Sequence, residues 1–240
     1  MTTKPFPQIA PLGRVVFVGA HPDDETFTAA GILAAAAANG QMVACVTATR
    51  GEAGVQDPKR WSPARLAKIR EYEHHEALRI LGVSDQTWLG YPDGRCSDVS
   101  DEVAGRALRE VLARLRPDTV LTFGPEGLTG HDDHRAVARW VTQAAGSAQI
   151  YQAVCTPGQY RQLRRADERH NLFFAIEEPP LVERAACDIY FELPVELIEL
   201  KRVAMEAMPS QYEALMPDLV PDGVLGGGLS VECFVRGGGV

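Results

Sequence analysis

Short apolar runs alternate with longer segments of helical periodicity along the first 155 residues of the chain. Each run is rich in Val, Ile, Leu and Phe and ends at a turn that carries Gly, Pro or Asp. Continuous apolar runs of this length are typical of strands that are covered on both faces. Strands are therefore predicted at residues 15–18, 42–47, 83–89, 119–123 and 149–154.

Helices are predicted between these strands. In the segment 101–116, leucine and valine recur at spacings of three and four residues, which places them on one helical face. The other helices are expected at about 24–38, 63–81 and 131–145. Strands that alternate with helices indicate an α/β fold, a Rossmann-like and mostly parallel sheet with helices on both faces.

The alternation is lost after residue 155. The charged segment 161–169 is predicted to form a surface helix or a lid over the substrate. Further elements are a strand at 188–193, a helix at 195–208 and a strand at 231–235. Without a repeat or an interdomain linker, we expect one domain over residues 1–240. It comprises a doubly wound core at 14–155 and a smaller C-terminal α/β portion at 156–240.

Composition narrows the class of protein. A net charge of −8 without a basic stripe argues against a nucleic-acid binder. The five cysteines lie far apart and form no Cys-x-x-Cys pair, which favours reduced thiols in the cytoplasm and argues against a thiolate zinc site. The N-terminal residues do not resemble a secretory signal, and the longest apolar stretch, 29–38, is too short for a bilayer. We expect a soluble cytoplasmic protein with no membrane partner.

The most informative stretch is Gly-Ala-His-Pro-Asp-Asp-Glu at 19–25. It directly follows the first predicted strand, and open α/β sheets bind ligands at the carboxyl ends of their strands. One alternative is that Asp23 or Asp24 caps the next helix while His21 is solvated. Three consecutive carboxylates beside a histidine are costly without a cation, so the stretch predicts a cation site.

A second cluster, His-Asp-Asp-His at 131–134, follows the fourth predicted strand. His131 and His134 are three residues apart, so on a helix their rings can face one volume. The alternative is a solvated pair of histidines at a helix start. Two imidazoles and one carboxylate with an open coordination position are typical of catalytic zinc, and they also suit ferrous iron or another divalent metal.

The two clusters resemble the paired signatures of the LmbE-like (PIG-L) N-acetylglucosaminyl deacetylase superfamily. The resemblance extends to Thr-Arg-Gly-Glu at 49–52, the helix with Arg70 and Glu73, the turn at 89–94, and Ser-Gln at 210–211. It covers residues 14–155 well and the remainder in patches. It implies a zinc-dependent hydrolase that removes an N-acetyl group, at a linear amide C–N bond, from an amino-sugar conjugate.

The resemblance also implies roles for individual residues. His21, Asp24 and His134 correspond to the zinc ligands, Asp23 to the general base, and His131 to the group that stabilises the oxyanion or protonates the leaving amine. Zinc lowers the pKa of a bound water to about 7, and a free carboxylate beside it can accept the remaining proton.

Further roles follow from the same resemblance. Asp133 is expected to orient His131, or alternatively to serve as a first-turn helix charge. Arg70 and Asp93 match positions that contact sugar hydroxyls or attached groups, although Arg70 could also be a solvated helix charge. Glu25 is expected as a first-turn charge or a support for the ligands, and surface positions are expected for His74, His75 and His170.

Three residues depart from the family pattern. Thr129 stands where some relatives carry a Tyr that assists at the oxyanion, and Asp132 stands where Pro is usual. Met208 replaces a His of many bacterial relatives, which predicts a missing polar contact near the site rim. None of the three departures changes the metal ligands.

Other functions remain as alternatives. Within the same chemistry, the protein could be an amidase that cleaves a larger acyl group from a glucosaminyl (thiol) conjugate, with segment 155–186 setting the pocket size. A nucleotide-binding Rossmann-like module lacks support, because no Gly-x-Gly-x-x-Gly follows the first strand. A non-catalytic metal-binding or sugar-binding protein would not need Asp23. The sequence predicts no particular oligomeric state.

Overall fold

The computed structural model describes residues 5–54, 61–220, 225 and 227–237. Within them, one seven-stranded sheet has the order β3-β2-β1-β4-β5-β7-β6. The strands are β1 Val15–Gly19, β2 Val43–Thr47, β3 Asp85–Trp88, β4 Thr119–Phe123, β5 Gln149–Ala153, β6 Ile189–Glu192 and β7 Val231–Gly237. The first five are parallel, and β7 and β6 continue the sheet in antiparallel pairing. The predicted fold class is confirmed.

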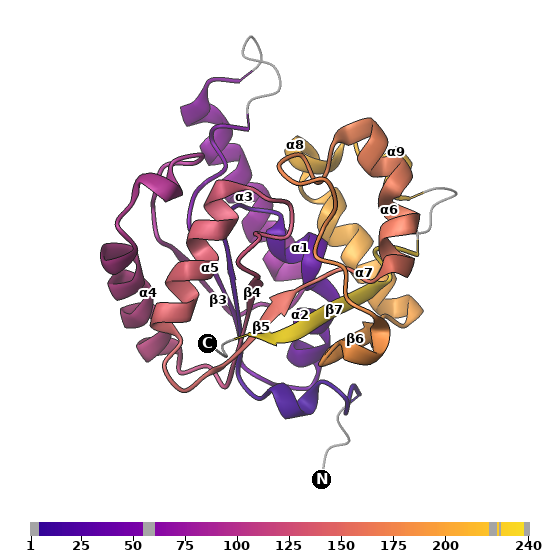
Figure 1. Cartoon of the computed structure of the whole chain (residues 1–240), viewed down its shortest axis with the longest axis horizontal. Helices are drawn as coiled ribbons and strands as arrows, with labels where there is room; N and C mark the ends of the chain where they lie inside the picture. The colour runs from indigo at the N-terminus through magenta and orange to yellow at the C-terminus, as the bar shows by residue number, and fades with distance from the viewer. Residues whose placement is uncertain (1–4, 55–60, 221–224, 226, 238–240) are drawn as a thin grey trace.

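The helices form two groups around this sheet. The helices are α1 Asp24–Thr28, α2 Ala30–Ala38, α3 Pro63–Ile80, α4 Asp101–Leu115, α5 Asp132–Ala144, α6 Pro157–His170, α7 Val195–Glu206, α8 Pro209–Tyr212 and α9 Met216–Leu219. Helices α4 and α5 pack together, whereas α7 packs against both α2 and α3, and Figure 1 shows the two groups on opposite faces of the sheet.

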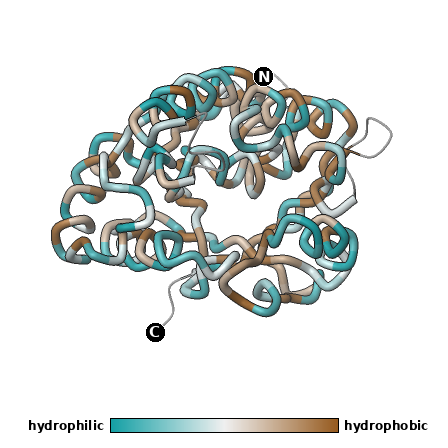
Figure 2. The backbone as a smooth tube through the Cα atoms, turned by 90° about the horizontal axis from the view of Figure 1, so that it is seen from above, coloured by the Kyte–Doolittle hydropathy of each residue, from teal (hydrophilic) through white to brown (hydrophobic). Residues whose placement is uncertain are grey.

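Burial explains the apolar runs in the sequence. Every residue of β1, β2 and β4 is buried, because helices cover both faces of the sheet there. Apolar and polar residues instead alternate along the outer helices (Figure 2). In α5, the buried Val137, Trp140, Val141 and Ala144 recur at helical spacing and face the sheet.

The predicted helix at 24–38 is wrong in one respect, because it consists of two helices that meet at Ala29, whose φ is −140°. At the break, the backbone N–H groups of Gly31 and Ile32 donate to the two carboxylate oxygens of Glu232, each at 2.8 Å. Lys201 Nζ pairs with the same carboxylate at 2.9 Å. A buried ion pair therefore holds the N-terminus of α2, and its acidic member comes from β7.

The C-terminal portion contains the predicted surface helix. Helix α6 begins with a reciprocal capping box between Thr156 and Gln159 and spans the charged segment. The loop after it, at residues 171–175, turns back towards the carboxyl end of β4, where Ala175 N donates to Thr129 O at 3.3 Å. No helix among the described residues is long and apolar enough to cross a membrane.

Candidate metal centre

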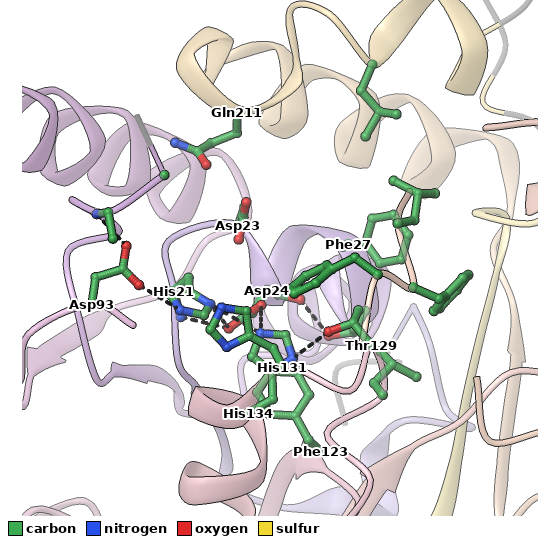
Figure 3. A pocket seen from close by; sticks show the side chains of 18 of the residues that line it. His21, Asp23, Asp24, Phe27, Asp93, Phe123, Thr129, His131, His134 and Gln211 are labelled. Carbon is green, nitrogen blue, oxygen red and sulfur yellow. Dashed lines mark hydrogen bonds and ion pairs between the residues drawn. The ribbon is translucent and has the colours of Figure 1, made fainter. Parts of the chain in front are cut away.

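The two acidic histidine clusters meet at the carboxyl end of the sheet, as predicted. His21, Asp23 and Asp24 follow β1, whereas His131 and His134 lie at the start of α5, after β4. Together they line a cavity of about 360 Å³. Figure 3 shows the imidazole rings gathered beside Asp24, with Asp23 above them and Asp93 to one side.

Three donor atoms are close enough to share one metal ion. His21 Nδ1 lies 3.2 Å from His134 Nε2, which in turn lies 3.2 Å from Asp24 Oδ1. The other oxygen of Asp24, Oδ2, is 3.9 Å from His21 Nδ1. Tetrahedral zinc with bond lengths of 2.0–2.1 Å would hold its ligand atoms roughly 3.3 Å apart. These residues therefore form a candidate site for a divalent metal.

Backbone contacts leave the correct atoms of Asp24 and His134 free for a metal. Asp24 Oδ2 accepts hydrogen bonds from the backbone N–H groups of Ala20 and His21, both at 2.8 Å, which leaves Oδ1 towards His134. His134 Nδ1 donates to Gly127 O at 2.8 Å, so its Nε2 keeps a lone pair. Burial opposes ionisation, but the contacts with His134 and His21 lower the pKa of Asp24 below its ordinary value.

Two carboxylates orient His21. Its Nε2 lies 3.0 Å from Asp93 Oδ1 and 3.2 Å from Asp133 Oδ2, so Nε2 carries the proton and Nδ1 is left for a metal. Burial lowers the pKa of His21, but these hydrogen bonds outweigh burial and raise it well above the ordinary value.

The predicted partner of Asp133 is wrong. Its carboxylate accepts from Gly94 N at 2.7 Å and Cys96 N at 2.9 Å and contacts His21, not His131. The side chain points from the first turn of α5 into the loop after β3, whose backbone donors hold it there.

His131 caps helix α5. Its Nδ1 accepts the backbone N–H of Asp133 at 3.0 Å, so in the neutral ring Nε2 carries the proton. Burial and the neighbouring His21 and His134 lower its pKa below the ordinary value. The ring is thus a hydrogen-bond donor at the cavity.

Asp23 has a backbone conformation that side-chain residues rarely adopt. Its φ is 121°, and its carbonyl accepts from Thr26 Oγ1 at 2.7 Å, Phe27 N at 3.0 Å and Tyr212 Oη at 3.2 Å. Strain of this kind persists only where the surroundings enforce it, often at active sites. No capping hydrogen bond from the side chain is found in the described structure, contrary to the helix-cap alternative. Burial and the adjacent Asp24 raise the pKa of Asp23 to about 8.

Arg70 and Asp93 both line the cavity. Arg70 is only 8% exposed, contrary to a solvated helix charge, and its Nε has no hydrogen-bond partner among the described residues. A side chain at Gly51 or Gly54 would overlap its guanidinium, so those glycines make room for it. Asp93 Oδ2 accepts from Ala53 N at 2.7 Å, and Asp93 also holds His21.

The surface position expected for His74 is wrong. The side chain is fully buried, with Nε2 3.1 Å from Thr47 Oγ1 and Nδ1 3.3 Å from Glu25 Oε1. Glu25 is also buried, and its Oε2 accepts from Asp23 N at 3.4 Å. Helical phase could have revealed this, because Arg70, His74 and Ala77 share one face of α3.

The other histidines and the departures from the family pattern have clear environments. His75 is exposed, as predicted, whereas His170 is half-buried and contacts Asp218 at 2.7 Å. Thr129 Oγ1 lies 3.3 Å from His134 Nδ1, and Met208 is fully buried. Sequence reasoning missed Tyr212 and Phe174, because they belong to segments without periodicity. The similarity at 210–211 was the only nearby signal.

Comparisons with known proteins agree on one family. The sequence model of that family, described as PIG-L, GlcNAc-PI de-N-acetylase, matches residues 16–145. The 1D-myo-inositol 2-acetamido-2-deoxy-alpha-D-glucopyranoside deacetylase of Corynebacterium glutamicum is 35% identical over 161 residues, which are 59% of this chain and 56% of that protein. This chain thus spans about half the length of that relative.

Solved structures share the fold. The N,N'-diacetylchitobiose deacetylase of Pyrococcus horikoshii has a TM-score of 0.64 at 23% identity, covering 98% of this chain and 87% of that one. GalB of Pseudomonas putida KT2440, a 4-carboxy-2-hydroxymuconate hydratase, has a TM-score of 0.63 at 18% identity, covering 95% and 97%. Because this architecture occurs in a deacetylase and a hydratase, the reaction must be argued from the site.

Proposed function

This chain belongs to the PIG-L family, whose sequence model matches residues 16–145, and from that premise we propose that it is a zinc-dependent deacetylase. The substrate is an N-acetylglucosamine-type amino sugar within a small-molecule conjugate, and the bond cleaved is the linear amide. One observation carries the proposal: the donor atoms of His21, Asp24 and His134 converge on a cavity that Asp23 and His131 also line.

The donor set suits zinc. Two imidazoles and one carboxylate with an open side are a catalytic zinc arrangement, and ferrous iron uses similar ligands. When bound, the metal polarises the amide carbonyl and lowers the pKa of water from about 16 to about 7. The Gly127 carbonyl holds the ring of His134, and the carboxylates of Asp93 and Asp133 hold the ring of His21, so both rings are oriented for this role.

The other residues of the site move protons and stabilise charge. Asp23 accepts a proton as water attacks the acetyl carbon, and it returns that proton to nitrogen as the C–N bond breaks. Asp23 lines the cavity directly beside the predicted ligand Asp24, which places its carboxylate within reach of both transfers. The Nε2–H of His131 donates to the carbonyl oxygen, where negative charge develops. The products are acetate and the free amine.

One side of the cavity is polar and can bind the sugar. Arg70, Asp93 and Gln211 line it together with the backbone at Gly54 and Gly94. The buried guanidinium of Arg70, whose Nε lacks a hydrogen-bond partner among the described residues, is suited to sugar hydroxyls. The free cysteines favour a reducing compartment, so we also propose the cytoplasm as its location.

Amine release from a panel of N-acetylglucosamine conjugates tests this function. We expect zinc-loaded protein to release one amine per acetate, chelator to abolish release, and re-addition of zinc to restore it. Release that persists after complete metal removal would contradict the proposal. If no conjugate in the panel is hydrolysed although the protein carries one zinc per chain, the result would favour a non-catalytic metal-binding or sugar-binding protein.

A further inference from the structure

The cavity has two chemically different walls. The polar wall carries Asp93, Arg70 and Gln211, and the opposite wall is mostly apolar, with Thr129 among its members. In Figure 3, Asp93 and Phe27 lie on opposite sides of Asp24, with Gln211 on the side of Asp93. The metal ligands and Asp23 lie between the two walls, so a bound amide there has one substituent on each side.

The apolar wall is assembled from four separate segments. They are α1, the loop after β4, the loop after α6 and the residues after α8, which contribute Phe27, Leu128, Leu172, Phe173, Phe174 and Leu215. Because these segments lie far apart in the sequence, no short sequence motif contains the wall. The wall is therefore a tertiary feature, and half of it comes from the loop that the sequence left without periodicity.

The loop that carries Phe174 is anchored in place. Phe173 is 3% exposed and packs edge-on against Tyr160 at 5.6 Å. Ala175 N donates to Thr129 O at 3.3 Å, and a side chain at Gly130 would overlap the backbone of Ala175. The loop therefore rests directly on the chain that leads to His131.

Phe174 is the exposed member of the wall. Its side chain is 53% exposed, and its ring meets that of His131 edge-on at 5.3 Å. The apolar surface of an exposed aromatic ring stays in contact with water, which is unfavourable, unless a ligand covers it. It thus lies where it can contact a substrate without disturbing the core.

From this arrangement we infer that the apolar wall receives the acyl side of the amide, and that the protein hydrolyses N-acyl groups longer than acetyl faster than acetyl itself. The inference rests on the proposed amide hydrolysis. Sugar hydroxyls placed against Phe27 and Leu128 would lose their hydrogen bonds to water, whereas Arg70 and Asp93 can replace them. With the sugar on the polar wall and the carbonyl between the walls, the acyl chain extends along the apolar wall.

The size of the cavity suits a short chain. A volume of about 360 Å³ lies at the small end of the range for ligand pockets. Each methylene that is buried against the wall should raise kcat/KM up to roughly fourfold, as expected for its transfer from water. The increase ends where the chain passes Phe174 and reaches solvent.

A series of glucosamines acylated with acetyl, propanoyl, butanoyl or hexanoyl groups tests the inference. For zinc-loaded protein we expect kcat/KM to rise from acetyl to butanoyl. Phe174→Ala should reduce the butanoyl advantage about fivefold, while Phe174→Leu retains most of it. Val195→Ala is the matched control, because Val195 is 76% exposed and lies outside the cavity lining.

Binding separates failure of this inference from failure of the proposed function. Affinity of the zinc-loaded Asp23→Asn variant for the same series should rise with chain length even though turnover is lost. Hydrolysis of acetyl with kcat/KM falling along the series would overturn the inference and leave the function intact. Binding that tightens with length without hydrolysis of any member by the wild type would overturn the function. A preference for alkyl groups on the anomeric oxygen in place of acyl length would assign the wall to the aglycone and also overturn the inference.

Discussion

Asp133→Asn should weaken metal binding although Asp133 is not a predicted ligand. Its Oδ2 accepts from Gly94 N at 2.7 Å and lies 3.2 Å from His21 Nε2, while Oδ1 accepts from Cys96 N at 2.9 Å. The side chain of an asparagine has one carbonyl oxygen, which accepts hydrogen bonds, and one NH2 group, which only donates them. In either orientation, the NH2 group faces a backbone N–H group that had donated to the carboxylate.

The magnitude follows from these contacts. Loss of a buried partner for a backbone donor costs about 1–3 kcal/mol, so the free energy of unfolding of the metal-free variant should fall by that amount. Removal of a residue that orients a ligating histidine typically weakens metal affinity about 10–100-fold. That range corresponds to about 1.4–2.8 kcal/mol of binding free energy. Asp93 still contacts His21, so we expect the lower half of the range.

Competition with a chromophoric chelator measures the zinc dissociation constant, and Asp132→Asn is the matched control. Asp132 precedes Asp133 in the same helical turn, but its side chain is 72% exposed and pairs only with Arg135 among the described residues. We expect this control to match the wild type within twofold. Asp133→Asn with unchanged zinc affinity but reduced kcat would refute the reasoning, because it would show that Asp133 acts through His131.

Three further predictions follow. His134→Ala should lose stoichiometric zinc in metal analysis, whereas His75→Ala, at an exposed position, should retain it. Lys201→Met should lower the free energy of unfolding in denaturant titrations by about 3–5 kcal/mol, because it leaves the buried carboxylate of Glu232 unpaired; a loss below 1 kcal/mol would contradict this. Burial raises the pKa of Glu73 above its ordinary value of 4.5. The protonated carboxyl group therefore stabilises the folded protein at low pH, and this contribution is lost as the pH rises through the raised pKa. The free energy of unfolding of Glu73→Gln, relative to that of the wild type, should therefore be higher at pH 7 than at pH 4. An equal difference between the two proteins at both pH values would contradict this prediction.

The sequence predicts the features that depend on short stretches of chain. The buried strands are visible as apolar runs because helices cover both faces of the sheet. The two histidine clusters could be brought together because each lies between a parallel strand and the helix that follows it, and such strands end at one edge. The placement of His21, Asp24 and His134 around one cavity agrees with that argument.

The features that the sequence did not predict depend on distant residues. The break between α1 and α2 accompanies hydrogen bonds from Gly31 and Ile32 to Glu232, about 200 residues further along the chain. Asp133 has a first-turn position in either interpretation, and only the loop at Gly94 decides which ring it contacts. Phe174 lies in a loop, where no periodicity indicates which side chains face the cavity.

The central claim is that a single metal site hydrolyses an N-acyl amide with Asp23 as the base. Its most direct test is acetate release from an N-acetylglucosamine conjugate, measured together with bound zinc in the same samples of wild type and Asp23→Asn. We predict that wild-type activity rises in proportion to zinc up to one equivalent. Asp23→Asn should bind the same equivalent and release acetate about 10²–10⁴-fold more slowly. Equal rates for the two proteins, or full activity of the wild type without zinc or another divalent metal, would contradict the claim.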